Sequence, residues 1–285
     1  MTQGSLTDEI NTLAAPYTPG QGQITLTYEP RGLAAGALIS CGLNTFYVLA
    51  VDTSTKIATV LASYEGGPDA AAAAGDVVVV RPRVTNYMVW QEILSTIDLM
   101  SAPSNGLYKV ASFVTTVDPV WQTYPVPVEA AAMTGVLGVR YRLPGSPDRF
   151  IDVRGWRLQS QDVTALFPTG KVVKVNADVP GGTDLQVIYK APFTLPTATT
   201  DTLEVTCGLA STMTDIPTIG AAGTLMLGQE ARRQQVGSQT DPRRSEEVMS
   251  GGNLGVARSY LALRDQRIRD EFSRLVALNP DSLQV

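Results

Sequence analysis

Hydrophobic and polar positions alternate along several short segments in the first third of the chain. Residues 24–28 alternate with a period of two, and residues 46–51 and 56–61 are rich in β-branched and aromatic side chains. The polar turn between the last two segments predicts a β-hairpin. Four consecutive valines at 77–80 predict a further strand that is buried on both faces. The pattern therefore predicts a small β module over residues 24–84.

An arm and a helix are expected on either side of this module. Residues 1–23 are predicted to form an N-terminal arm, with a short helix over 6–15 followed by a linker rich in proline and glycine. After the module, apolar residues recur every three or four positions, which predicts a helix in the segment 85–106. Thr85 or Asn86 is suited to cap the N-terminus of that helix.

A second β domain is predicted after the mid-chain helix. Short segments rich in strand-forming residues alternate there with proline, glycine and aspartate, as in an antiparallel β-sandwich. We assign this domain to residues 107–212. Its expected strands are 107–117, 120–124, 136–143, 150–158, 171–175, 185–189 and 202–207.

The remaining segment, 213–285, is predicted to be helical. One helix is expected over 215–236 and a second over 254–278, where Asn279 and Pro280 end it. The apolar residues of the second helix recur at helical spacing and form one stripe. The expected fold is therefore mixed α+β and mainly antiparallel β, with a small β module, a β-sandwich, a mid-chain helix and C-terminal helices.

The composition restricts the chemistry that the chain can perform. It contains no histidine, which removes the common Ser-His-Asp and Cys-His triads, imidazole bases and histidine-bound metals. Its two cysteines, Cys41 and Cys207, are too few for a structural zinc site, and we expect two buried free thiols rather than a disulfide. We therefore expect no enzyme and no cofactor or metal, although carboxylate-based chemistry stays open.

The net charge and the hydropathy of the chain indicate which binding partners and which cellular location to expect. The net charge of −5 argues against a general nucleic-acid binder but is compatible with a wall past which DNA slides. The longest apolar stretches are interrupted by polar residues and are too short for a bilayer, and the N-terminus lacks the features of a signal peptide. We expect a soluble protein that is made in the cytoplasm and has no membrane partner.

Arginines are concentrated towards the C-terminus. All nine basic residues between Gln229 and Arg274 are arginines, and seven acidic residues lie among them. Arginine without lysine favours bidentate, partly desolvated ion pairs of the kind found at protein interfaces. The alternative is an exposed helix face on which opposite charges pair along the helix. A DNA-contacting role is weaker, because the acidic residues dilute the positive field.

Three stretches carry a resemblance to neck proteins of tailed bacteriophages. Residues 58–67, the alanine run and Gly75 resemble a small β module of phage virion proteins, with alanines where that module often has a histidine. The helix at 87–100, followed by 107–110 and 141–144, is similar to head-to-tail connector proteins of long-tailed phages.

In the third stretch, the secondary-structure elements near the C-terminus follow the same order as in those connectors. A β segment is followed by an apolar helix at 219–227 and then by an arginine-rich helix. The resemblance covers most of residues 45–278 as an order of elements and rests on no single diagnostic motif.

The resemblance implies a virion structural protein of the phage neck. Such a connector, or adaptor, would form a homo-oligomeric ring, sixfold or more often twelvefold, between the portal protein and the next neck or tail protein, a stopper or terminator. DNA would pass through it without sequence-specific binding. By position, Leu254–Val285 would be the segment that docks onto the portal. The docking residues would be Leu254, Ala257, Leu261, Arg264, Arg267, Ile268, Arg269, Phe272 and Leu275.

Two other functions compete with the connector. A tail-tip or baseplate protein that binds a receptor glycan would need exposed aromatic platforms, for which Trp121, Tyr124 and Trp156 are candidates, although core packing explains such residues as well. A carboxylate hydrolase would need a cleft that contains Asp148 and Asp152. These two residues lie near arginines, which is more typical of a solvated surface.

Overall fold

The computed structural model describes residues 9–118, 120, 122–143, 145, 149–160, 167–239 and 252–279, without the side chains of 160, 230–239, 252 and 253. The chain forms two compact units. The first comprises Met1–Leu94 and Gly220–Leu261, and the second comprises Ser95–Ile219 and Ala262–Val285.

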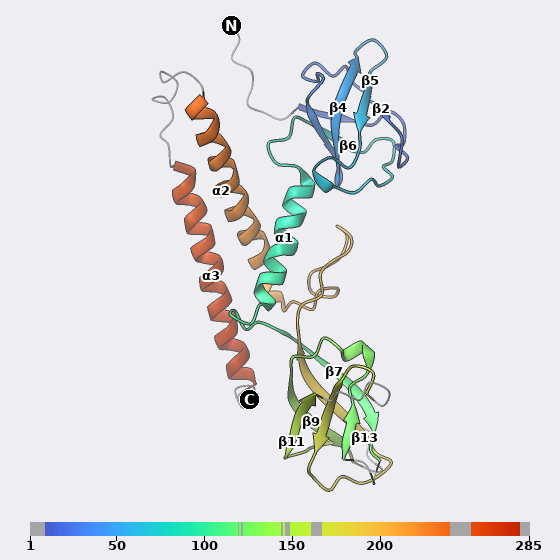
Figure 1. The fold of residues 1–285 in the computed structure, drawn as a ribbon, viewed down its shortest axis with the longest axis vertical. Coiled ribbons are helices and arrows are strands. Elements are labelled where there is room, and N and C mark those ends of the chain that lie inside the picture. Colours follow the sequence, from blue (N-terminus) through green and yellow to red (C-terminus); the bar gives the residue numbers. More distant parts are fainter. Residues whose placement is uncertain are drawn as a thin grey trace. The chain divides into compact units, whose positions relative to one another are not determined.

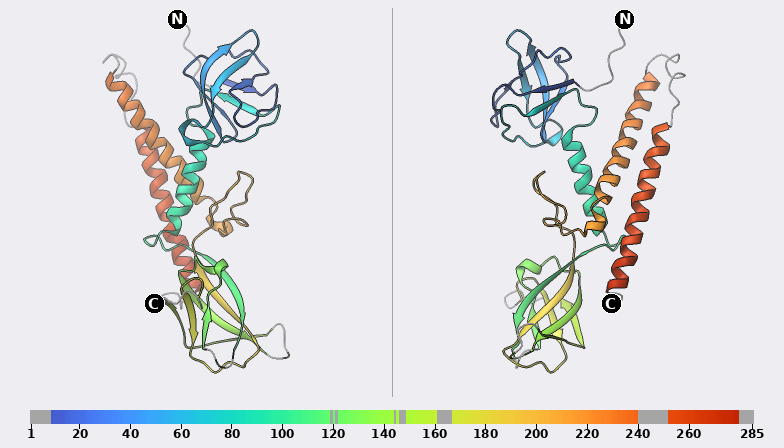
Figure 2. Two further views of the ribbon diagram at one scale, coloured as in Figure 1. Left: turned by 45° about the vertical axis from the view of Figure 1, so that its right-hand side comes forward. Right: turned by 180° about the vertical axis from the view of Figure 1, so that it is seen from behind.

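A curled six-stranded antiparallel sheet forms the β part of the first unit (Figures 1 and 2). Its strand order is β1-β6-β3-β4-β5-β2, and a bridge between Leu13 and Leu26 joins the two ends of this order. The strands are β1 (Glu9–Thr12), β2 (Gln23–Thr25), β3 (Leu38–Cys41), β4 (Asn44–Asp52), β5 (Ile57–Leu61) and β6 (Val77–Val80). The predicted hairpin is confirmed, since β4 pairs antiparallel with β5.

The interior of this sheet is a single apolar cluster. Phe46, Ile39 and Val48 are almost completely buried in it. The ring of Tyr17 meets the ring of Phe46 edge to face at a centroid distance of 5.0 Å, a favoured aromatic geometry. The Tyr17 hydroxyl donates a hydrogen bond to Asp69 at 2.6 Å, and burial together with this carboxylate raises the pKa of Tyr17. Tyr17 therefore connects the core to the loop before β6.

Two predictions for the first unit are wrong. The helix expected over 6–15 is not formed by its described residues, because 9–12 are the strand β1 that pairs with β6. Asn11 is buried and Ile10 is 69% exposed, the alternation of a strand with one covered face. The valine run is likewise not buried on both faces: Val78 and Val80 are buried, whereas Val77 is 55% exposed. An antiparallel sheet curled around one core leaves its outer face open.

Three helices follow the predicted pattern. They are α1 (Asn86–Ser101), α2 (Ile216–Gln239) and α3 (Gly252–Leu278). Thr85 caps α1 as predicted, because its hydroxyl accepts a hydrogen bond from the backbone N–H of Met88 at 3.2 Å. Among the described residues, no helix combines the length and the hydropathy needed to span a bilayer.

The second unit contains an antiparallel sandwich of two sheets (Figure 1). One sheet has the order β10-β9-β13-β7, and the other has the order β11-β12-β8. Both contribute to one core, in which Val139 and Val187 of the first sheet pack with Val173 of the second. The strands are β7 (Lys109–Thr116), β8 (Thr123–Pro125), β9 (Gly135–Arg142), β10 (Phe150–Asp152), β11 (Trp156–Ser160), β12 (Lys171–Val175) and β13 (Asp184–Ala191).

The sandwich confirms the predicted mixed α+β fold, with two local differences. The strand expected over 150–158 is two strands in different sheets, because the chain turns at Gly155, where φ is +84°. The strand expected over 202–207 is a series of turns instead. Short helical turns of the 3-10 type complete the two units at Tyr64–Gly66 (η1), Val128–Ala130 (η2) and Ser211–Met213 (η3).

Candidate docking site on the C-terminal helix

The predicted apolar stripe of α3 faces mainly the interior of the chain's own fold. Ala257, Ile268 and Leu275 are buried. Leu254, Leu261 and Arg264 are half-buried. The side chain of Arg267 is 31% exposed, whereas Arg269 and Phe272 belong to the exposed class. The stripe therefore serves intramolecular packing, and two of the nine nominated residues remain open to a partner.

Glycines bring α3 close to its neighbours. In the first unit, a Cβ atom added at Gly223 of α2 would lie 2.9 Å from the Leu261 side chain. In the second unit, a Cβ atom added at Gly106 would lie 2.7 Å from the ring of Phe272. Gly106 also has a φ of +67°, a conformation that disfavours other residues. The Phe272 ring therefore rests on the backbone that follows α1.

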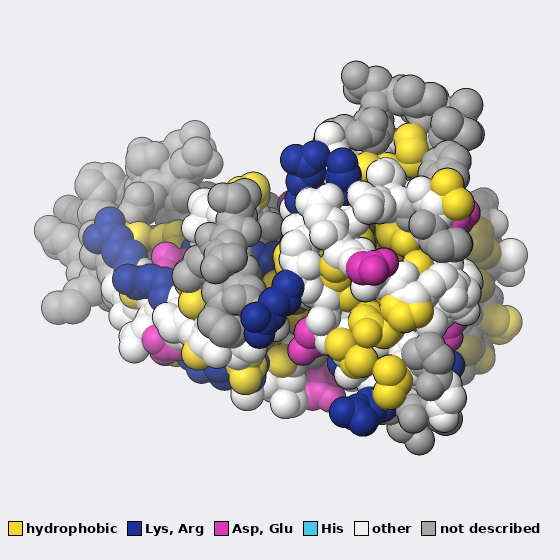
Figure 3. Space-filling view, turned by 90° about the horizontal axis from the view of Figure 1, so that it is seen from below, with side chains coloured by type: hydrophobic (Ala, Val, Ile, Leu, Met, Phe, Trp, Pro, Cys, Tyr) yellow, Lys and Arg dark blue, Asp and Glu magenta, His cyan; other side chains and the backbone are white. Residues whose placement is uncertain are grey.

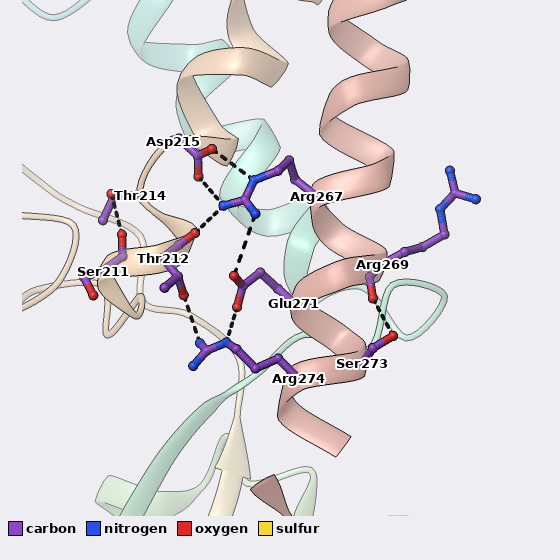
Figure 4. Close-up of polar contacts among 9 residues, drawn as sticks. All are labelled: Ser211, Thr212, Thr214, Asp215, Arg267, Arg269, Glu271, Ser273 and Arg274. Atoms are coloured by element: carbon purple, nitrogen blue, oxygen red, sulfur yellow. Dashed lines mark hydrogen bonds and ion pairs between the residues drawn. The ribbon is translucent and has the colours of Figure 1, made fainter. Parts of the chain in front are cut away.

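An ion-pair cluster, which we call the Glu271 cluster, fixes the end of α3 to the start of α2 (Figure 4). It comprises Thr212, Asp215, Arg267, Glu271 and Arg274. Nε and Nη2 of Arg267 donate to the two carboxylate oxygens of Asp215 at 3.1 and 3.2 Å, and Nη2 also donates to the Thr212 carbonyl at 2.6 Å. Nε of Arg274 donates to Glu271 at 2.7 Å, and its Nη2 donates to the Thr212 hydroxyl at 2.9 Å.

Glu271 is the buried centre of this cluster. Its side chain is 6% exposed, and its second carboxylate oxygen lies 4.0 Å from Nη1 of Arg267. A buried carboxylate is stable when cations and hydrogen bonds surround it. The hydrogen bonds to Asp215 raise the pKa of Arg267. The cluster therefore holds α3 in one rotation about its axis, and this rotation fixes which residues face outward.

The outward residues Arg269 and Phe272 border a cavity of about 430 Å³. Nε of Arg269 donates to the Asp265 carbonyl at 3.1 Å, and Phe272 is 37% exposed. The cavity is lined by Pro103, Ser104, Asn105, Gly106, Asp265, Ile268, Arg269 and Phe272. An aromatic ring beside a guanidinium is a combination that recurs at the energetic centres of protein interfaces.

Sequence reasoning missed a second exposed set of side chains on α3. Val256, Tyr260 and Leu263 are 45%, 38% and 43% exposed. They follow one another at spacings of four and three residues, so they share a face of the helix. The helical spacing of these three residues is visible in the sequence, but the apolar stripe beside it is longer and was the stronger prediction.

The arginines of α3 with ion pairs in the described part of the chain pair with acidic residues of the chain itself. Arg267 and Arg274 form part of the Glu271 cluster, whereas Arg264 pairs with its exposed neighbour Asp265 at 2.7 Å. Four further arginines of the run fall where the structure describes no side chains; they are Arg232, Arg233, Arg243 and Arg244.

The structure describes three of the five residues that were considered for glycan binding or hydrolysis. Tyr124 is buried in the sandwich core, and Trp156 is half-buried beside it. Trp156 also lines an open cavity of about 980 Å³ together with Asp152 and Arg154. Trp121 and Asp148 lie outside the described residues. Among the residues described, no group of three or more acidic or cysteine side chains is arranged to hold a metal ion.

Both cysteines are free and buried, as predicted. Burial raises the pKa of the Cys41 thiol to about 11, with a contribution from Asp76. Burial also raises the pKa of Cys207. Neither thiol therefore has the low pKa that a nucleophilic cysteine requires.

Comparison of the sequence with models of known protein families and with curated proteins gives no match.

Proposed function

We propose that this chain is a structural protein of a bacteriophage virion, a head-to-tail connector of the neck whose α3 end docks onto the portal protein. It would be synthesised in the host cytoplasm and would assemble into a ring, twelvefold in the preferred form. The next neck or tail protein would bind at another surface, and DNA would pass through the ring. No catalysis and no cofactor are part of the proposal.

The observation that carries the proposal is the fixed presentation of Arg269 and Phe272. The Glu271 cluster determines the rotation of α3, so both side chains face outward before a partner arrives. A preformed aromatic and guanidinium surface loses little conformational entropy on binding. Figure 3, which views the molecule from below, also shows hydrophobic side chains gathered at the surface, as expected for a subunit of a larger assembly.

The docking proposal predicts a loss of portal binding in the variant Phe272→Asp. A carboxylate at the centre of a desolvated contact is costly, so we expect the affinity for purified portal to fall by at least about 30-fold, the range of an interface hot spot. Arg269→Glu should weaken binding in the same direction. The measurement is the binding of labelled protein to immobilised portal by interferometry.

The matched control is Val205→Asp, which adds the same charge at a valine that is 87% exposed and lies outside α3. It should bind portal as the wild type does, and the circular dichroism spectra of all variants should agree. Wild-type affinity of a folded Phe272→Asp variant would rule out this surface as the docking site.

The second candidate function is glycan binding at the tail tip. The cavity beside Trp156 favours it, because an aromatic ring flanked by a carboxylate and a guanidinium is suited to a sugar. Binding of host surface polysaccharide that is lost in Trp156→Ala, together with no affinity for the portal, would support this function over the connector.

A further inference from the structure

β7 is a long edge strand of its sheet. The four-stranded sheet ends at β7 on one side and at β10 on the other. β7 has eight residues, and no described strand pairs with its outer edge. From Val110 to Thr116 it contains no charged residue, glycine or proline. Charges, proline and bulges are the usual means by which proteins prevent edge strands from pairing with other chains.

The opposite edge of the same sheet is protected, and the edge strands of the other sandwich sheet, β8 and β11, are shorter than β7. β10 has three residues and carries Asp152. The guanidiniums of Arg140 and Arg142 lie over its Phe150 at 4.6 and 5.7 Å from the ring centroid. The curled sheet of the first unit has its two ends joined through Leu13 and Leu26.

The alternation of hydrogen bonds between β7 and β13 shows which backbone groups of β7 point away from β13. Val117 N–H donates to the carbonyl of Thr183 at 2.8 Å on the β13 side, and the Lys190 carbonyl accepts from Thr134 on the β9 side. Bonding alternates along an antiparallel pair, so the odd-numbered residues of β7 bond to β13. The N–H and C=O groups of Val110, Ser112, Val114 and Thr116 therefore point to the outer edge. These four residues are also the exposed ones of the strand.

We propose that this edge pairs antiparallel with β7 of a second copy of the chain. One register uses all four outward residues of both copies: Val110 lies opposite Thr116 of the partner subunit, and Ser112 lies opposite Val114 of the partner subunit. Four pairs of residues then exchange two hydrogen bonds each, and the two-fold axis passes beside Phe113.

The chemistry of the edge favours the second copy as its occupant. The segment is free of charge, so self-pairing brings no like charges together, and its valines and threonines pair well across antiparallel strands. In this dimer, the four-stranded sheets of the two copies form one continuous eight-stranded sheet.

This contact is separate from the one that would close a ring. A two-fold contact uses the same surface on both copies, whereas a ring requires two different surfaces. The inference therefore does not depend on the connector function, and the dimer is expected in the free protein.

The register predicts a specific cross-link. The double variant Ser112→Cys/Val114→Cys places two thiol pairs across the strand pair, with Cα atoms about 5.5 Å apart, which suits a disulfide. We expect mild oxidation to convert the full-length protein into a disulfide-linked dimer that reducing agent dissolves. Each single variant should cross-link much less, because its thiols face a residue that is not cysteine.

A backbone variant tests the hydrogen bonds of the same pairing. Val114→Pro removes an N–H that β13 does not use and should raise the dimer dissociation constant by more than about tenfold in sedimentation equilibrium. Val114→Thr keeps the N–H and the branched shape and should dimerise as the wild type does. A wild-type protein that stays monomeric at every concentration and forms no cross-link would overturn the proposal. So would a folded Val114→Pro variant that dimerises normally.

Discussion

Phe46→Ala is expected to lower the free energy of unfolding of the first unit by about 3–5 kcal/mol, the range measured for phenylalanine in closed cores. Phe46 is 1% exposed, and its ring contacts Tyr17 edge to face. The substitution therefore removes buried apolar area and an aromatic contact, and it leaves a cavity in a sheet curled around one core. Urea denaturation followed by circular dichroism measures the difference.

The control lies on the same strand. Leu49 is 51% exposed, so Leu49→Ala should change the free energy of unfolding by less than about 0.5 kcal/mol. Equal effects of the two substitutions would contradict the assignment of Phe46 to the core and of Leu49 to the outer face.

Glu271→Ala is expected to destabilise the second unit by about 2–4 kcal/mol. The change removes the hydrogen bond from Arg274 and the charge near Arg267. Arg274 loses its carboxylate partner, whereas Arg267 keeps its hydrogen bonds to Asp215. The expected value lies below that for a fully buried ion pair, because the side chain of Arg274 is 40% exposed and regains water.

Asp265→Ala is the matched control for Glu271→Ala. Asp265 also pairs with an arginine of α3, but its side chain is 54% exposed, so its loss should cost no more than about 0.5 kcal/mol. A similar small effect at Glu271 would mean that the cluster does not hold α3 and does not fix the docking surface.

The hydrophobic pattern correctly predicted elements whose conformation depends mainly on local sequence. The strand at 171–175 and the Thr85 cap of α1 are of this kind. Residues 9–12 are different, because β1 exists through its pairing with β6, a distant partner that local sequence does not specify. The split at Gly155 depends on packing between two sheets.

The candidate site shows the same limit. An apolar stripe has the same spacing whether a partner protein or the chain's own core covers it. Sequence therefore nominated Ala257, Ile268 and Leu275, which the fold buries. The burial of Glu271 was hidden within a charged run, because its partners Arg267 and Arg274 resemble surface residues in sequence. Arg269 and Phe272 remain from the nominated set as the outward pair.

The most direct test of the connector is the mass of the purified full-length chain, alone and mixed with the portal protein, by native mass spectrometry. The connector account predicts a complex of defined stoichiometry with the portal ring, twelve copies in the preferred form. A two-copy species without portal would report the β7 contact and is distinguishable by its mass. A chain that stays a monomer, dimer or trimer and leaves the mass of the portal unchanged would contradict the connector function.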